Sequence, residues 1–480
     1  MLKFLDQILS EFRDCFRRTR TFEWFVILVV GIMVRTDLLG VTSVVRSLNL
    51  DPGTYELLIN FFHSYGWDLS AIRTTWMEIV SKRAPLLICN GHAVLICDGV
   101  KQVKEARYSP GTKKMPQDSE TQSKPRMIHG QLWGVVSALI GNCHLGQKTS
   151  SALPLSAELQ DGLASTAEWD GSTKTHDSHP LQLLKNVTHA ASTIGKPAYL
   201  LADSYFVTRK NLRHIDAYNA DAPNPVDMIS KCRRDAAAYK FPPPKLPGQR
   251  GAPSKKGDKI VLLEVFTLSE SSFKTKRMFL YGKRESVKYY HEILLWGGGL
   301  YRPILFVFVR YRNVYAVLFC TDCDANPLDV IRLYCARFKI EDSFRVQKQS
   351  IGGLKSHFWT SFCPRLNYYK KKTDPDPLLG ITDAHARNKI LSSVRATEMH
   401  MMIACIAHGL LQMLPLQYPV DRKKLRFQRS FSSERISEEN MMQYLRNIIF
   451  IEFGKKSQLP IIQIIQGKQA FSEAIQAASA

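Results

Sequence analysis

The sequence is organised around one stretch, YCARFKIEDSFRVQK at residues 334–348. It lies within a predicted helix from about residue 327 to residue 351. A helix turns by about 100° per residue, so residues three, four or seven positions apart share a face. The polar residues that share one here are Tyr334, Arg337, Glu341 and Lys348. One carboxylate is therefore predicted to lie among cationic and hydroxyl groups.

An apolar stripe runs beside this polar face and consists of Leu333, Ile340, Phe344 and Ile351. Such a stripe buries a helix against a core, which would hold the polar face at the rim of that core. Taken alone, Arg337 and Glu341 also fit an ordinary i,i+4 ion pair on a surface helix. The pair by itself does not identify a functional site.

The complete pattern Tyr-x2-Arg-x3-Glu-x6-Lys carries a family resemblance, together with the phrase KIExxFRxxKQ that begins at Lys339. It resembles the signature of DDE transposases of bacterial insertion sequences, in the insertion-sequence-four group. The resemblance extends over residues 20 to 415 and includes LLADSYF at residues 200–206. It implies that Glu341 is a metal ligand and requires two aspartates upstream.

Composition favours a globular protein with a polyanionic partner. The 480 residues are 45% hydrophobic and 22% charged, enough for two or three domains with their own cores. The 65 Lys and Arg against 43 Asp and Glu give a formal net charge of +22. Nucleic acid is the first candidate partner, and an acidic membrane surface is the second.

The cysteines and the apolar segments bear on localisation. The ten cysteines stand in scattered, apolar contexts, which predicts reduced core residues of a cytoplasmic protein. A DNA partner would make the protein nucleoid-associated. Cys320 and Cys323 have no second pair, so zinc is not expected. The apolar run at residues 25–34 is about half the length needed to span a bilayer. It predicts a buried helix and no membrane association.

Residues 1–83 are predicted to form a helical domain. Two of its helices meet at a Pro-Gly turn at residues 49–53, which fits either a helix-turn-helix or a plain bundle. The resemblance implies that this domain binds the ends of the transposable element.

Two aspartates follow apolar strands further along the chain. The strand at residues 93–97 is predicted to end at Asp98, and the strand at residues 198–202 is followed by Asp203. Alone, each is either a turn former or a ligand at a sheet edge. The predicted order of strand, strand, strand, helix, strand, helix opens a ribonuclease-H-like fold. In that fold the first and fourth strands are neighbours, which would bring the two aspartates together.

The fold class is therefore predicted to be α/β, with a ribonuclease-H-like catalytic domain. A β-rich insertion is expected from the resemblance, and helical regions flank the core. The predicted divisions are residues 1–83, a first core part at 84–220, an insertion at 221–311, a second core part at 312–370 and a helical C-terminal region at 371–480.

Three carboxylates suit the cleavage of phosphodiester bonds. Two Mg²⁺ ions roughly 4 Å apart can activate a nucleophile and stabilise the leaving oxygen, and Mg²⁺ prefers carboxylate oxygens. The resemblance assigns these ligands to Asp98, Asp203 and Glu341, with Mn²⁺ as a substitute metal. Arg337 and Lys348 would then hold DNA phosphates. Tyr334 would donate a hydrogen bond from its hydroxyl to a phosphate. The alternative is that Tyr334 is a half-buried residue at the rim of the core.

Further aromatic and acidic residues precede the signature helix. Tyr311 and Tyr315 are candidates for stacking a base, although the related transposases use a tryptophan near this point. Asp322 and Asp324 are predicted to form a turn and a helix cap.

The resemblance implies a cut-and-paste transposase that cleaves double-stranded DNA at transposon ends and joins it to target DNA. It would act as a homodimer in the DNA complex. The alternative is a non-catalytic DNA-binding protein derived from a transposase.

Overall fold

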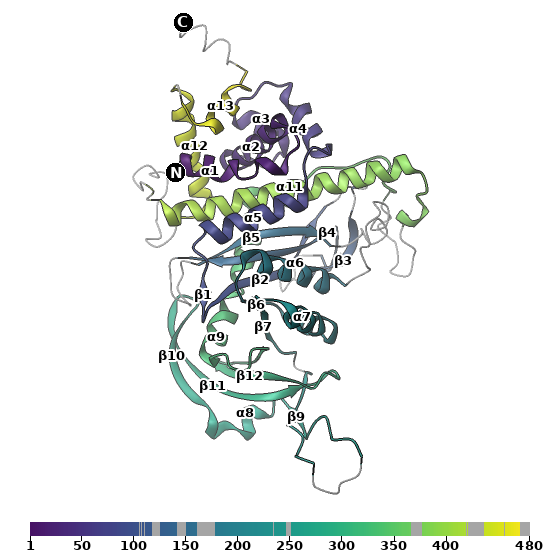
Figure 1. The fold of residues 1–480 in the computed structure, drawn as a ribbon, viewed down its shortest axis with the longest axis vertical. Coiled ribbons are helices and arrows are strands. Elements are labelled where there is room, and N and C mark those ends of the chain that lie inside the picture. Colours follow the sequence, from purple (N-terminus) through teal and green to yellow (C-terminus); the bar gives the residue numbers. More distant parts are fainter. Residues whose placement is uncertain are drawn as a thin grey trace.

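The computed structural model gives the chain a mixed α/β architecture (Figure 1). It describes residues 1–470 except 105, 107, 110, 118–124, 142–149, 161–177, 234, 246–250, 366–376, 419, 421–435 and 456. The boundary predicted at residue 370 lies outside the described residues.

The strands form one mixed sheet. In chain order the described strands are β1 Ile88–Cys89, β2 His92–Val103, β3 Thr112–Pro116, β4 Met127–Ile140, β5 Ser151–Leu159, β6 Ala198–Leu201, β7 Val226–Lys231, β8 Ala237–Tyr239, β9 Lys259–Val261, β10 Lys274–Leu280, β11 Lys283–Trp296, β12 Arg302–Tyr311 and β13 Val314–Cys320. Their spatial order is β3-β4-β2-β6-β7-β13-β12-β11-β8-β9. Beside this path, β1 pairs with β2, β5 with β4 and β10 with β11.

The strands that carry the two aspartates are neighbours, as the sequence predicts. β2 and β6 run parallel from the pair Ala93 and Ala198 to the pair Ile96 and Leu201. β7 continues the parallel arrangement beside β6, whereas β4 pairs with β2 antiparallel. Parallel neighbours need a helical crossover, and α6, His179–Ile194, supplies part of the connection that leads into β6.

The division predicted at residue 221 needs correction. It assigns Val226–Lys231 to the insertion, but this strand lies inside the sheet between β6 and β13. The reason is that β13 pairs antiparallel with β7, so the later strands extend the same sheet. The β-rich segment therefore begins after β7.

Helices from both termini lie together on one side of the sheet (Figure 1). They are α1 Leu2–Ser10, α2 Thr19–Val34, α3 Val41–Ser47, α4 Thr54–His63, α5 Leu69–Arg83, α11 Ala384–Gln417, α12 Glu438–Phe453 and α13 Pro460–Gln466. Besides α6, the described part of the chain also forms α7 Arg209–Asp221, α8 Val265–Leu268, α9 Pro327–Ala336 and α10 Lys339–Val346. The N-terminal and C-terminal helices share one hydrophobic core rather than forming separate cores.

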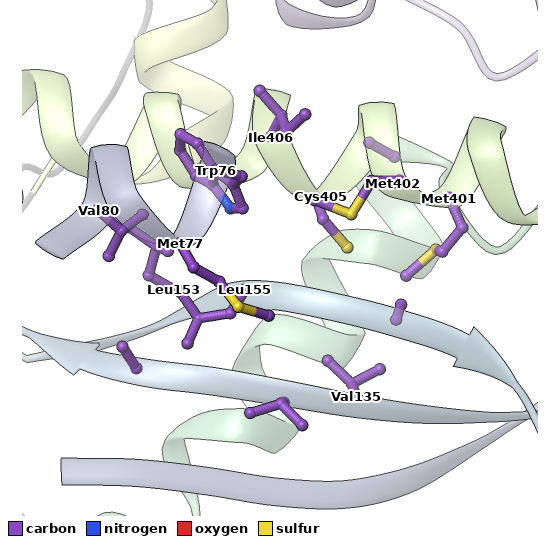
Figure 2. Packing of buried hydrophobic residues seen from close by; sticks show 14 of the residues in the cluster. Trp76, Met77, Val80, Val135, Leu153, Leu155, Met401, Met402, Cys405 and Ile406 are labelled. Atoms are coloured by element: carbon purple, nitrogen blue, oxygen red, sulfur yellow. The ribbon is translucent and has the colours of Figure 1, made fainter. Parts of the chain in front are cut away.

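The contact between this helical layer and the sheet is tightly packed. Trp76 of α5, Leu153 of β5 and Cys405 of α11 belong to the same core (Figure 2). The Trp76 indole N–H donates to the Pro154 carbonyl at 2.9 Å, which satisfies its buried polar atom. A Cβ atom on Gly409 would lie 2.4 Å from the Trp76 ring. A glycine is therefore required where α11 crosses this indole.

The most apolar helices are buried in this core. Every residue of α2 from Trp24 to Val34 is buried, which agrees with the buried helix predicted at residues 25–34. Among the described residues, α11 is the one helix long and apolar enough to cross a membrane, and most of it is enclosed by the fold. A core helix has the same composition, so this feature alone does not indicate a membrane.

The predicted signature helix is divided into three parts. α9 is followed by α10 and then by a π-helical turn at Gln347–Ile351. The cap of α9 is Asn326, whose side chain accepts from the Leu328 N–H at 2.9 Å, so the prediction that Asp324 caps the helix is wrong. Asp322 makes the predicted turn by accepting from the Asp324 N–H at 2.9 Å. Its other oxygen accepts from the Tyr199 hydroxyl at 2.7 Å.

Candidate active site

Asp98 lies within β2 rather than at its end, so the predicted end of this strand is wrong. β2 pairs with β4 as far as Val103, whereas its pairing with β6 stops at Ile96. Side chains alternate along a strand, so Asp98 shares a face with Val94 and Ile96. Those residues pack in the core that contains α9. Asp98 therefore points toward the signature helix from the point where β2 loses β6 as a neighbour.

Asp203 follows β6 directly and is placed at the carboxyl end of that strand. Its Oδ1 accepts from the Ser204 N–H at 2.6 Å and caps the 3₁₀ turn Ser204–Phe206. Asp203 is thus both a turn former and a candidate metal ligand. Capping uses one carboxylate oxygen, which leaves the other oxygen for a further partner.

Arg337 joins two of the candidate carboxylates. Its Nη1 donates to Asp98 Oδ2 at 3.0 Å, and its Nη2 donates to Glu341 Oε1 at 3.2 Å. The Glu341 side chain is 51% exposed, whereas those of Arg337 and Asp98 are 18% and 25% exposed. The i,i+4 ion pair considered from sequence exists, but it is one arm of a bridge to β2.

The charges of this site influence one another. Burial raises the pKa of Asp98 to about 6, with further increases from the Asp203 and Glu341 carboxylates and a decrease from Arg337. Burial alone would lower the pKa of Arg337, but the surrounding groups, Asp98 first, raise it overall. Burial also raises the pKa of Tyr334. The structure therefore brings Asp98, Asp203, Tyr334, Arg337 and Glu341 into one electrostatic unit.

The donor atoms of this unit suit a hard divalent cation, because all three candidate ligands offer carboxylate oxygens. The described residues include no group of three His, Cys, Asp or Glu side chains already arranged as metal ligands. The Arg337 guanidinium instead supplies the positive charge between Asp98 and Glu341. The donor set fits a metal provided that Arg337 releases the carboxylates.

Lys348 contacts β2. Its Nζ donates to the Lys101 carbonyl at 2.9 Å, three residues beyond Asp98 along the strand. The contact ties the π-helical turn to the strand that carries the first aspartate. Lys348 is thus near the site.

The two candidate stacking residues lie on opposite faces of the sheet. Arg310 pairs with Tyr315 across β12 and β13, whereas Tyr311 pairs with Val314, and successive side chains of a strand alternate. Tyr315 lines a cavity of about 970 Å³ that also contains Asp203. The Tyr311 ring instead packs 6.3 Å from the Tyr281 ring, measured between centroids. The two tyrosines cannot stack the same base.

The cavity beside Asp203 is lined by three cationic side chains that were not predicted from the sequence as site residues. Its lining includes Lys231, Arg233 and Arg310, and the Arg310 guanidinium lies 5.4 Å from the centre of the Tyr315 ring. A pairing of alternate residues across β12 and β13 would have found Arg310 beside Tyr315. Lys231 of β7 could not be assigned to this cavity from sequence, because its position depends on β7 belonging to the sheet.

Comparison with known proteins defines the class. The family model described as DDE superfamily endonuclease matches residues 11–277. The match covers more than half of the chain, so the chain belongs to this family of endonucleases. It includes Asp98 and Asp203 and ends before Glu341. The family implies a ribonuclease-H-like fold and a DNA substrate, and its nucleases generally use divalent metal ions. No curated protein and no solved structure matches the chain.

Proposed function

We propose that the chain is a cut-and-paste DNA transposase of the insertion-sequence-four group, with the Tyr-Arg-Glu-Lys signature. The observation that carries this proposal is the single guanidinium of Arg337 shared by Asp98 and Glu341. A strand residue and a helix residue 243 positions apart in the sequence thereby converge, with Asp203 on the neighbouring strand. The order β5-β4-β2-β6-β7, in which only β4 runs antiparallel to the other strands, supports a ribonuclease-H-like core.

Asp98, Asp203 and Glu341 would hold two Mg²⁺ ions, with Mn²⁺ as a substitute. Divalent ions supply the charge that activates the attacking oxygen and stabilises the leaving 3′ oxygen. Arg337 would then turn its guanidinium from the carboxylates to a DNA phosphate, which it can bind through two parallel hydrogen bonds. Lys348 and Tyr334 would hold the neighbouring backbone. Tyr315, in the cavity with Asp203, is the better placed of the two candidates for stacking a base.

The partners in this proposal are double-stranded transposon ends and target DNA, bound by a homodimer in the cytoplasm without a membrane. The net charge of +22 supports a polyanionic partner. The domain boundaries proposed from sequence are kept, apart from the β-rich segment, which starts after β7.

The test is metal-dependent cleavage of end DNA by the wild type and by Asp98→Ala, Asp203→Ala and Glu341→Gln. Each substitution should reduce the rate by on the order of 10³-fold, because each removes several kcal/mol of metal-mediated stabilisation. Asp342→Asn is the matched control, since its side chain is rotated by about 100° from Glu341 on the same helix. DNA binding by the wild type without any cleavage would favour the non-catalytic alternative.

A further inference from the structure

A second cavity, of about 840 Å³, lies beyond Asp98 along β2. One wall is formed by the end of β2 and the following residues, and the other by the segment after the signature helix. The Gln102 end of the cavity is roughly 13 Å from Asp98, at about 3.3 Å per strand residue. Lys348 of the signature helix, which precedes one wall in the chain, donates to the carbonyl of Lys101, which precedes the other wall. The cavity is therefore coupled to the candidate active site through both β2 and the signature helix.

The wall after the signature helix is an extended segment with alternating burial. Lys355, His357 and Trp359 are exposed, and we call these three residues the exposed strip. The intervening Phe358 is buried, with its ring 5.0 Å from the Phe62 ring, measured between centroids. The Ser109 hydroxyl donates to the Phe358 carbonyl at 3.2 Å, and the Thr360 N–H donates to the Tyr108 carbonyl at 3.2 Å. The strip is thus fixed in place with its side chains available.

Trp359 is unusual among the tryptophans. Its exposed fraction is 63%, whereas that of every other tryptophan that the structure describes is at most 8%. Tyr108, on the opposite side of the cavity, is 39% exposed. Large exposed aromatic faces in a concave site are typical of places where a flat ligand stacks.

The charge of the cavity selects an anionic ligand. Lys104 and Lys355 both line it, and its described lining residues include no carboxylate. The Lys104 ammonium donates to the Ser356 carbonyl at 2.9 Å, and burial lowers its pKa to about 8, so a nearby anion would favour its charged form. A smaller cavity of about 370 Å³, which Trp359 also lines, contains Glu56 instead. An anion is therefore better accommodated beside Lys104 and Lys355.

We propose that this cavity binds an unpaired nucleotide of the DNA substrate, with its base on Trp359 and its phosphates beside Lys104 and Lys355. The proposal rests on the DNA substrate in the proposed function. A base exposes its flat face to a side chain only when it leaves the stack. At about 3.4 Å per nucleotide, the distance of roughly 13 Å from Asp98 places the unpaired nucleotide about four positions from the cut.

The first test is the binding of single-stranded oligodeoxythymidylate of ten residues to the full chain in EDTA, followed by tryptophan fluorescence. The wild type should show quenching on binding, and Trp359→Phe should lose this signal while keeping affinity within about fivefold, since phenylalanine still stacks. Trp359→Ala should bind roughly 5- to 150-fold more weakly, because stacking of one base contributes about 1–3 kcal/mol. Phe362→Ala, an exposed aromatic outside the cavity lining, should bind as the wild type does.

The second test concerns the phosphates. Lys355→Gln should reduce the slope of log affinity against log salt by about 0.7, the value for one phosphate contact with a single strand. The proposal is overturned if Trp359→Phe shows the same quenching as the wild type, or if Trp359→Ala keeps wild-type affinity. Quenching of equal size by an unbroken duplex would overturn it as well.

These outcomes are separate from those of the proposed function, because binding is measured without a divalent metal. Cleavage of end DNA by the wild type without quenching by the single strand would reject the nucleotide site alone. Quenching that depends on Trp359, in a chain that cleaves no DNA with Mg²⁺ or Mn²⁺, would reject the transposase activity alone.

Discussion

The two ends of the signature helix are held in different ways. Its carboxylate end, residues 334–341, makes charged contacts that are partly exposed, and Arg337 serves two carboxylates at once. Its anchored end, residues 347–353, makes buried contacts to both terminal helical regions. A metal ion and a DNA phosphate can replace the partners at the carboxylate end, because that end is partly exposed. The partners at the anchored end are buried, so nothing from solvent can replace them. The same helix can therefore be held in place by buried contacts at one end while its charged side chains at the other end change partners.

The anchored end depends on close approach as well as hydrogen bonding. The Gln347 amide donates to the Ala404 carbonyl at 3.3 Å and lies 3.1 Å from His408 Nδ1. A Cβ atom on Gly353 would lie 2.6 Å from the Ala404 Cβ. The chain directly after the π-helical turn thus fits against α11 with no room for a residue larger than Gly353.

The largest expected effect comes from Arg35, which donates to the Ile351 carbonyl from α2 and is itself 4% exposed. Arg35→Met should lower the free energy of unfolding by about 3 kcal/mol, because it leaves a buried carbonyl without its partner. Denaturant titration measures this change. Arg46→Met is the matched control, since its pair with Asp37 is on the surface and should contribute about 0–1 kcal/mol. Equal losses in both variants would remove the distinction between the two ends.

The carboxylate end should respond to pH. The Asp98 pKa of about 6 in the folded chain exceeds its ordinary value of 3.8, so the folded state binds this proton more tightly. The resulting stabilisation is complete below about pH 4 and is lost as the pH rises through about 6. Without metal, the wild type should therefore lose about 1–3 kcal/mol relative to Asp98→Asn between pH 4 and 7. A constant difference across this range would contradict the burial of Asp98.

Arg337 should compete with the metal if the carboxylate end exchanges its partners. In the absence of DNA, Arg337→Gln should bind Mn²⁺ on the order of tenfold more tightly, a typical coupling between two competing partners. Electron paramagnetic resonance of free Mn²⁺ measures the affinity without requiring cleavage. Arg332→Gln removes the same group from the same helix, where it pairs with Asp329 at 2.8 Å, and should leave the affinity unchanged. Weaker binding by Arg337→Gln would mean that the arginine supports the ligands.

The sequence predicted the shared face of the signature helix because helical spacing is a local property. It also predicted β2 and β6 as neighbours, since the order of elements opens a ribonuclease-H-like fold, in which the first and fourth strands pair. It did not predict that β2 continues past Asp98, because that depends on β4 extending its pairing after β6 has ended. The place of β7 likewise depends on β13, a strand more than 80 residues later in the chain.

The candidate site likewise contains some residues that local sequence patterns predict and others whose placement depends on distant parts of the chain. The polar face of the signature helix predicted Tyr334, Arg337 and Glu341 as site residues. No local pattern shows that Arg337 reaches Asp98, 239 positions earlier. Tyr311 and Tyr315 looked equivalent in the sequence, and only the register of β12 and β13 separates their faces. Trp359 carried no signal, because its exposure results from the anchoring of Phe358 in the helical layer.

The smallest expected effect belongs to Lys348, which lies at the anchored end but contacts the strand of the carboxylate end. Lys348→Met should lower the free energy of unfolding by about 1 kcal/mol, since one hydrogen bond to a backbone carbonyl is lost. If Lys348 also meets a DNA phosphate, the slope of log affinity against log salt should fall by about 0.9 for duplex DNA. Lys82→Met, which removes an exposed lysine paired with Glu78, should change neither quantity appreciably. A loss of stability with an unchanged salt slope would assign Lys348 to the anchored end alone, because a lysine committed to the Lys101 carbonyl neutralises no phosphate.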